Sequence, residues 1–408
     1  MIEFVSKFVV LSYISLIRGQ VHKLNKMLVL KDFLDEEDIL YFTMIGLDVC
    51  FVNAIRRIIL SDIDVCCIEF DSNGHDDGSI NITVNTGRLH NEILKHRLSC
   101  IPVYIKNNIN DIYGKEKDIK LKSTVQKFCD EMILEINVCN NQDTSIIVTS
   151  GDFNVKNIKT GEYIDAKKIF PPNRLTNDYI DFSRLRPKIS DTIPGESLKL
   201  TAKFSVSNAS KNSVHNVVSI CSYSNSLDKK EIEARWKVIH QDLCVKDLSE
   251  ECILFEKTNF YYLDANRYFI KDSFDFKIQS ICALSNREIL TLATYKLWKK
   301  CHDFLNLINT RKIIILISES TIPFCFDIQL YDEDYTFGRI LEYFLYQKYY
   351  LLNHFSYCGF KKFHPHDIKS VIRIAFTISP NPNDIYIILA ECCQHALQTI
   401  ENIQSQIV

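Results

Sequence analysis

An acidic run over residues 71–78 is the first segment whose side chains could bind a cation. It reads Asp-Ser-Asn-Gly-His-Asp-Asp-Gly, and carboxylates and amides at such close spacing can supply oxygen ligands to calcium. A calcium loop of this type needs glycine at its sixth position and glutamate at its twelfth, where this chain has Asp76 and Ile82. We therefore expect a solvated turn and predict no calcium site.

The histidines and cysteines are not spaced as metal ligands. His90 and His96 are six residues apart, which does not place them on one helical face, and the His-Pro-His segment at 364–366 is better explained as a turn anchored by its proline. The chain has 15 cysteines but no Cys-x-x-Cys motif. We expect free thiols that fill the core in a reducing compartment, and no metal or other cofactor in this chain.

Sequence motifs for catalysis are missing as well. The chain has 11 glycines, no glycine-rich phosphate loop, no Gly-x-Ser-x-Gly elbow and no aspartates spaced for two magnesium ions. The formal net charge is -3 and the charges are spread along the chain, so direct binding to duplex DNA is not indicated. The sequence predicts a chain without catalytic residues.

Two adjacent arginines, Arg56 and Arg57, are the remaining candidates for a specific role. Most helical arginines are solvated, and a solvated helix flank is the simpler interpretation of this pair. The alternative is an anchor whose guanidinium groups bind a carboxylate or a backbone carbonyl of a partner chain.

The arginines lie on a predicted helix that follows a predicted strand. Residues 39–45 are rich in Tyr, Phe and Thr and predict the strand; Gly46 ends it, and Asp48 is a suitable N-cap for a helix that reaches about Leu60. The apolar residues at helical spacing on one face are Phe51, Ile55, Ile58 and Ile59.

The chain of 408 residues is long enough for two or three domains. Residues 65–223 alternate short apolar strands with polar turns and predict a β-rich domain inserted into a first module. That module begins at 28–64, where a leading segment at 28–38 has an acidic end, and it resumes at 224–309. There an alternating strand at 274–278 precedes a capping box of Ser285 and Glu288 and a long helix. The stripe of this helix comprises Leu290, Ala293, Leu297, Cys301, Phe304 and Ile308.

Residues 310–408 predict a second module with a similar order of elements. Strands are expected at 313–317, 324–330 and 368–378, and the segment 332–341 repeats the design of 53–60, with capping residues before an apolar helix. A turn and cap at 380–384 begin a terminal helix with a stripe of Leu389, Cys392, Cys393, Ala396, Ile400 and Ile403. The helices at 53–60 and 332–341 each have an apolar face that neither can bury alone, so we expect the two faces to pack against each other. The sequence therefore predicts an α+β fold in which two modules dimerise within one chain.

The N-terminal residues 1–27 form a separate predicted extension. Its apolar run at 8–17, between Lys7 and Arg18, is too short to span a bilayer, and no small-x-small cleavage site follows it. The extension is expected to be either a packed addition or the result of an early start codon, with Met27 as the functional start.

Two blocks of the first module carry a family resemblance. The segment Val-Asn-Ala-Ile-Arg-Arg-Ile-Ile-Leu at 52–60 resembles the signature of the α-like subunits of RNA polymerase, and so does the block at 85–102, which contains His96-Arg97-Leu98. The family comprises the bacterial α N-terminal domain, the archaeal D subunit and the third subunit of RNA polymerase II. A weaker similarity covers residues 195–218.

The C-terminal module is similar to the smaller partner, the eleventh subunit of RNA polymerase II or archaeal L, at residues 333–338, 359–365 and 368–376. That pattern normally has Asn and Arg where this chain has Arg339 and Glu342. Lineages with four cysteines in the inserted domain bind a cluster or zinc there; this chain lacks that spacing, so no metal is carried over.

The resemblance implies a non-catalytic assembly subunit of a DNA-directed RNA polymerase, formed by fusion of two subunits as large DNA viruses tend to do. Its partners would be the two large catalytic subunits and a small tenth-subunit-like protein, with DNA and RNA contacted only through the complex and no membrane. The expected location is the host cytoplasm or virion if the chain is viral, and otherwise the nucleus. A free-standing protein that regulates or mimics polymerase assembly is the alternative.

The resemblance also implies two sets of site residues. It favours the anchor interpretation of the arginines and places five residues at an interface with a large subunit: Asn53, Arg56, Arg57, His96 and Arg97. The expected core of the intramolecular dimer comprises Phe51, Ile55, Ile58, Ile59, Phe337, Leu341, Phe344, Leu345, Leu389 and Ile400.

Overall fold

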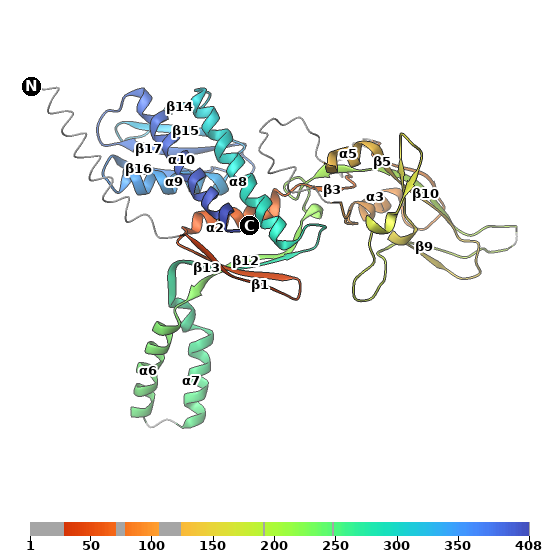
Figure 1. Cartoon of the computed structure of the whole chain (residues 1–408), viewed down its shortest axis with the longest axis horizontal. Helices are drawn as coiled ribbons and strands as arrows, with labels where there is room; N and C mark the ends of the chain where they lie inside the picture. The colour runs from red at the N-terminus through yellow and green to blue at the C-terminus, as the bar shows by residue number, and fades with distance from the viewer. Residues whose placement is uncertain (1–27, 71–77, 106–123, 191, 247–248, 408) are drawn as a thin grey trace, which may run out of the picture. The chain divides into compact units, whose positions relative to one another are not determined.

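The computed structural model describes residues 28–70, 78–105, 124–190, 192–246 and 249–407 and has an α+β fold (Figure 1). It divides into two compact units. The first contains the described parts of Met1–Arg57, Ile220–Ile278 and Thr294–Val408, and the second contains those of Ile58–Ser219 and Gln279–Ala293. The predicted N-terminal extension and residues 71–77 of the acidic run lie outside the described residues.

One four-stranded sheet of the first unit has the order β1-β2-β13-β12. Its strands are β1 (Val29–Glu36), β2 (Ile39–Ile45), β12 (Val218–Leu227) and β13 (Phe269–Ser280). The predicted strand at 39–45 is confirmed as β2, in which the alternate residues Leu40, Phe42 and Met44 are buried. Residues 28–38, predicted as a leading segment, are largely a strand, because β1 pairs antiparallel with β2.

Helix α2 (Val49–Ser61) follows β2 in the chain, as predicted. Its first turn is capped because the Asp48 carboxylate accepts a hydrogen bond from the backbone N–H of Cys50 at 2.9 Å. Phe51 and Ile55 are 1% and 0% exposed, whereas Arg56 and Arg57 are half-buried on the flank of the helix. The apolar stripe therefore faces the core and the arginines do not.

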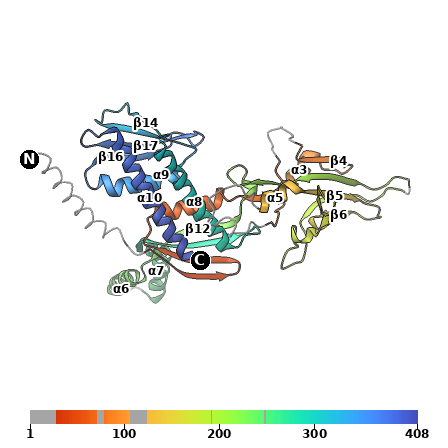
Figure 2. The same ribbon diagram turned by 45° about the horizontal axis from the view of Figure 1, so that its top comes forward.

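A second sheet of the first unit has the order β14-β15-β17-β16, and three helices gather against it (Figure 1, Figure 2). The elements are β14 (Ile314–Ile317), β15 (Cys325–Tyr331), β16 (Phe355–Lys361), β17 (Lys369–Phe376), α8 (Asn286–Asn309), α9 (Tyr335–Leu345), the π-helical turn Tyr346–Tyr350 and α10 (Pro382–Ile407). The predicted strand at 368–378 is too long, since Ile368 and Ile378 are 64% and 79% exposed beyond the ends of β17.

The predicted capping box at the start of α8 and the predicted apolar stripe of α10 are confirmed. At the start of α8, Glu288 accepts from the N–H and hydroxyl of Ser285 at 2.6 and 2.9 Å, and the Glu288 N–H donates to the Ser285 hydroxyl at 3.3 Å. The six stripe residues of α10 are fully buried. In α9, Gly338 permits a close contact with β16, because a Cβ there would lie 2.2 Å from the Phe360 ring.

Helices α6 (Lys229–Val245) and α7 (Glu250–Tyr262) form a hairpin between β12 and β13 that was not predicted from the sequence (Figure 1). Its small core consists of Ile232, Phe260 and Ala265, with Trp236 among the residues packed against it. The apolar residues of α7 lie on several faces; Leu254 and Phe255, for example, are 65% and 63% exposed. The helix therefore lacks the single apolar stripe from which a helix is inferred.

The second unit is β-rich and has its own core. A five-stranded sheet has the order β4-β10-β5-β7-β8, and two further pairs are β11-β3 and β6-β9. The strands are β3 (Val65–Cys67), β4 (Ile80–Asn85), β5 (Met132–Cys139), β6 (Ile146–Thr149), β7 (Asn154–Asn157), β8 (Tyr163–Ile164), β9 (Asp181–Leu185), β10 (Ser197–Lys203) and β11 (Ser205–Ser207), and the helices are α3 (Asn91–Ser99) and α5 (Thr124–Glu131). Side chains from both helices and from most of these strands form one apolar cluster.

Candidate functional site

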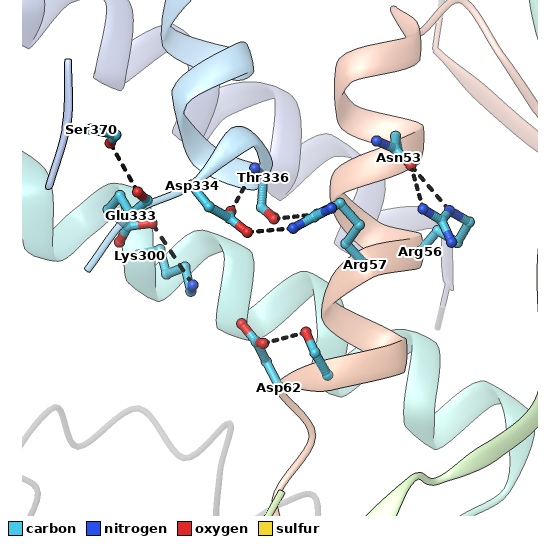
Figure 3. Close-up of polar contacts among 10 residues, drawn as sticks. Asn53, Arg56, Arg57, Asp62, Lys300, Glu333, Asp334, Thr336 and Ser370 are labelled. Atoms are coloured by element: carbon cyan, nitrogen blue, oxygen red, sulfur yellow. Dashed lines mark hydrogen bonds and ion pairs between the residues drawn. The ribbon is translucent and has the colours of Figure 1, made fainter. Parts of the chain in front are cut away.

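Arg57 on α2 binds the beginning of α9, which is 277 residues further along the chain (Figure 3). Its Nε donates to the Thr336 hydroxyl at 2.8 Å, and its Nη2 donates to the Asp334 carboxylate in an ion pair. The two donors of one guanidinium thus fix two neighbouring groups at the N-terminus of α9. The pair joins a residue of the predicted first module to the predicted second module.

Asp334 has a double role in this contact. Its carboxylate also accepts from the backbone N–H of Thr336 at 2.8 Å and so caps α9. Burial by itself would raise the pKa of Asp334, but the hydrogen bonds from Thr336 and the positive charge of Arg57 outweigh burial and lower that pKa. The carboxylate is therefore ionised at neutral pH.

We expect Arg57→Ala to destabilise the protein moderately. The side chains of Arg57 and Asp334 are 38% and 35% exposed, so the loss should be about 1 kcal/mol and not the several kcal/mol of a fully buried pair. Because folding lowers the pKa of Asp334, its contribution is fully present above the ordinary aspartate pKa of about 3.9 and is lost as the pH falls through the lowered value.

Thermal melts of the wild type and Arg57→Ala at neutral and acidic pH would measure this effect. The difference in melting temperature should be present at pH 7 and should shrink below about pH 4. Arg235→Ala, in the helical hairpin, is a control that should not reproduce this pH dependence. Equal melting temperatures at pH 7 for the wild type and Arg57→Ala would show that the contact does not stabilise the fold.

Arg56 is held differently from its neighbour. Its Nε and Nη2 both donate to the Asn53 side-chain oxygen, at 3.0 and 2.9 Å (Figure 3). This acceptor is neutral, and within the residues that the structure describes no carboxylate forms an ion pair with Arg56. Asn53 therefore orients the guanidinium without neutralising its charge.

The other two predicted interface residues, His96 and Arg97, lie on α3 in the second unit. The His96 ring meets Phe70 edge-on at 4.7 Å between ring centres. Arg97 donates to the backbone oxygens of Phe182 and Asp181 at 2.7 and 2.9 Å and thereby attaches α3 to β9. The structure thus brings together Asn53, Arg56 and Arg57 on α2 and does not place the α3 residues in the same unit.

The predicted dimer-core residues are all buried, at 7% exposure or less. In the first unit the Phe51 ring on α2 meets Phe344 on α9 edge-on at 5.9 Å, and Phe304 on α8 meets Phe337 on α9 at 5.1 Å. Ile58 and Ile59, at the end of α2, belong to the second unit. Aromatic contacts therefore accompany the Arg57 contact between α2 and α9.

Two further long-range contacts were not predicted. Gln406, near the end of α10, accepts from the Leu30 N–H at 2.8 Å and donates to the Leu28 carbonyl at 2.9 Å. The Trp298 indole N–H on α8 donates to Glu401 on α10 at 3.0 Å. Lone polar side chains outside an apolar stripe have no periodicity, so no sequence signal identifies their partners.

The described residues contain no group of three or more His, Cys, Asp or Glu side chains placed to hold a metal ion. Burial raises the pKa of the Cys67 thiol to about 11 and that of Cys221 to about 12, so both are protonated at neutral pH and unreactive. Among the helices of the described segments, none has both the length and the apolar character needed to cross a membrane.

Comparison with known proteins gives one family and several distant relatives. Residues 41–301 match the family described as the RNA polymerase Rpb3/Rpb11 dimerisation domain. The chain is 26% identical over 290 residues to DNA-directed RNA polymerase subunit Rpo3 of Methanosphaera stadtmanae, a match that covers 66% of this chain and 94% of the relative.

Two matches to subunits of RNA polymerases I and III are more local. The RPAC1 subunit of Dictyostelium discoideum is 28% identical over 153 residues, which cover 36% of this chain and 40% of that protein. The RPAC1 subunit of Mus musculus is 35% identical over 68 residues, which cover 17% of each chain. The chain therefore spans less than half the length of these two relatives.

Proposed function

Because this chain belongs to the family of the RNA polymerase Rpb3/Rpb11 dimerisation domain, we propose that it is a non-catalytic assembly subunit of a DNA-directed RNA polymerase. In this proposal the chain supplies both halves of an α-like dimer and serves as a platform for the two large catalytic subunits. A small tenth-subunit-like protein would complete the set of partners, and DNA and RNA would be contacted only through the assembled enzyme.

The observation that carries the proposal is the contact of Arg57 with Asp334 and Thr336, together with the Phe51–Phe344 contact. Both contacts join the helix with the family signature to the helix of the segment that resembles the smaller subunit. Two modules joined by one chain meet at an effective concentration on the order of millimolar when the link is short. The first step of assembly then needs no encounter between separate subunits.

Within this proposal, the residues of α2 have separate roles. Arg57 joins the two modules, whereas Arg56, oriented by Asn53, binds a carboxylate or backbone carbonyl of a large subunit. His96 and Arg97 form a second contact with a large subunit, and the Arg97 hydrogen bonds to β9 fix the position of α3 for that contact. These roles allow each side chain to be tested independently.

Co-expression of the tagged chain with the two large polymerase subunits from the same source tests the proposal. We expect both large subunits to be retained by the tag in equal amounts, and nucleotide polymerisation to occur with the complex but not with the isolated chain. Retention of neither large subunit would contradict the proposal and favour a free-standing interaction protein.

A further inference from the structure

A cavity of about 550 Å³ lies in the first unit, where the start of α2 meets α9 and β12. Tyrosines from β12, α9 and the π-helical turn form much of its wall. Its lining includes Asp48, Tyr223, Tyr335, Arg339, Glu342 and Tyr343. The proposed function does not use this cavity, although Asn53, which orients Arg56, is part of its wall.

The only basic residue in the lining is already neutralised. Arg339 donates to the Glu342 carboxylate at 2.5 Å, and its guanidinium lies 5.7 Å from the centre of the Tyr335 ring. These are the two positions at which the chain departs from the pattern of the smaller polymerase subunit. Because Arg339 and Glu342 neutralise each other, Asp48 and the tyrosine rings determine the electrostatic potential in the cavity.

The remaining charge near the cavity is negative. Asp48 accepts from the Cys50 N–H, and this neutral donor does not offset the negative charge of a carboxylate. The pKa of Tyr343 is raised to about 12, first by burial and then by the negative charge of Asp48, with Cys50 and Asp272 adding to it. The carboxylates of Asp48 and Asp272 are therefore close enough to the tyrosine wall to make the electrostatic potential there more negative.

Carboxylates beside several aromatic rings are a suitable environment for a cation with a flat or apolar body. The faces of tyrosine rings attract cations, and a guanidinium can stack on a ring while it donates hydrogen bonds to a carboxylate. Phosphates and other anions are disfavoured by the same negative charge. Arginine fits better than lysine because its planar group matches both the rings and the carboxylate.

We propose that this cavity receives an arginine side chain presented by a protein partner, with Asp48 as its carboxylate ligand and the tyrosines as its aromatic walls. The inference rests on the proposed function for the identity of that partner, which would be one of the large subunits. The chemistry of the cavity belongs to this chain alone and can be measured without any other subunit.

The test is a titration of the isolated full-length chain with N-acetyl-arginine methylamide, followed by ligand-observed NMR. N-acetyl-citrulline methylamide is the matched probe, because it has nearly the same shape without the positive charge. We expect the arginine compound to bind about tenfold more tightly than the citrulline compound. Asp48→Asn should remove most of this difference, and since asparagine is as good an N-cap as aspartate, α2 should stay intact.

Glu256→Gln, on the exposed face of α7, is the control and should leave the preference for arginine unchanged. Equal binding of the two compounds, preferential binding of inorganic phosphate, or an unchanged preference in Asp48→Asn would each overturn the inference. Failure of the large subunits to bind the chain would leave the titration result unaffected, so the inference and the proposed function can fail separately.

Discussion

Ile55→Asp is expected to abolish folding of the first unit. Ile55 is fully buried on the apolar stripe of α2, in the turn that follows Phe51. The substitution removes an aliphatic side chain and places a carboxylate where no water reaches it. The combined cost is on the order of 5 kcal/mol, which is comparable to the whole stability of many domains.

Circular dichroism during thermal unfolding would measure this result. Ile55→Val is the matched control, because it keeps the site apolar and should cost only about 1 kcal/mol. If Ile55→Asp melted within about 3 °C of the wild type, α2 would not be buried against the rest of the unit and the proposed joining of two modules would lose its basis.

Arg56→Ala is expected to leave the isolated chain folded but to weaken its binding to a large subunit strongly. Arg56 lies off the apolar stripe, and its side-chain hydrogen bonds go to Asn53 on the same helix, so little of the fold depends on it. Loss of a charge-assisted contact that is desolvated on assembly should cost about 2–5 kcal/mol, or a factor of about 30 or more in affinity.

A comparison of Arg56→Ala with Arg57→Ala distinguishes the two roles on α2. Arg57→Ala should lower the melting temperature and affect assembly mainly through that loss, whereas Arg56→Ala should affect assembly alone. The experiment is a thermal melt of each variant beside retention of the large subunits by the tagged chain, with Arg235→Ala as the control. A destabilised Arg56→Ala variant that retained the large subunits normally would show that Arg56 is structural.

The elements that could be predicted from the sequence are those with a regular apolar period and a local cap. Helix α8 is an example: its stripe contains Leu297 and Cys301, both fully buried, and the capping box of Ser285 and Glu288 marks its start. Strand β2 alternates with a period of two and was predicted with its correct bounds. In both cases the signal is contained in a few neighbouring residues.

The features that could not be predicted depend on partners far away in the sequence. The cap of α9 by Asp334 is local, but the position of Arg57 beside it depends on how α2 and α9 pack. The pairing of Gln406 with the backbone at Leu30 is of the same kind. Helix α7 of the hairpin was missed for another reason, because its apolar residues are not gathered on one face. In α6, by contrast, Ile232, Trp236 and Ile239 share one face, and this spacing could have indicated the helix.

In the candidate site too, the features with a local sequence signal could be predicted and those that depend on distant partners could not. The family signature identified the helix with Asn53, Arg56 and Arg57, and the apolar stripe separated the arginines from the core. The sequence could not distinguish the two arginines, because adjacent residues of one type differ only in what they face. In the structure Arg57 faces the N-terminus of α9 and Arg56 faces Asn53, so their expected roles differ.

We propose that one copy of this chain supplies both halves of the α-like dimer in the polymerase. Native mass spectrometry of the polymerase complex, purified through a tag on this chain, tests it most directly. We expect one copy of the chain with one copy of each large subunit. A complex with two copies of the chain, or a preparation in which the chain is present without the large subunits, would contradict it.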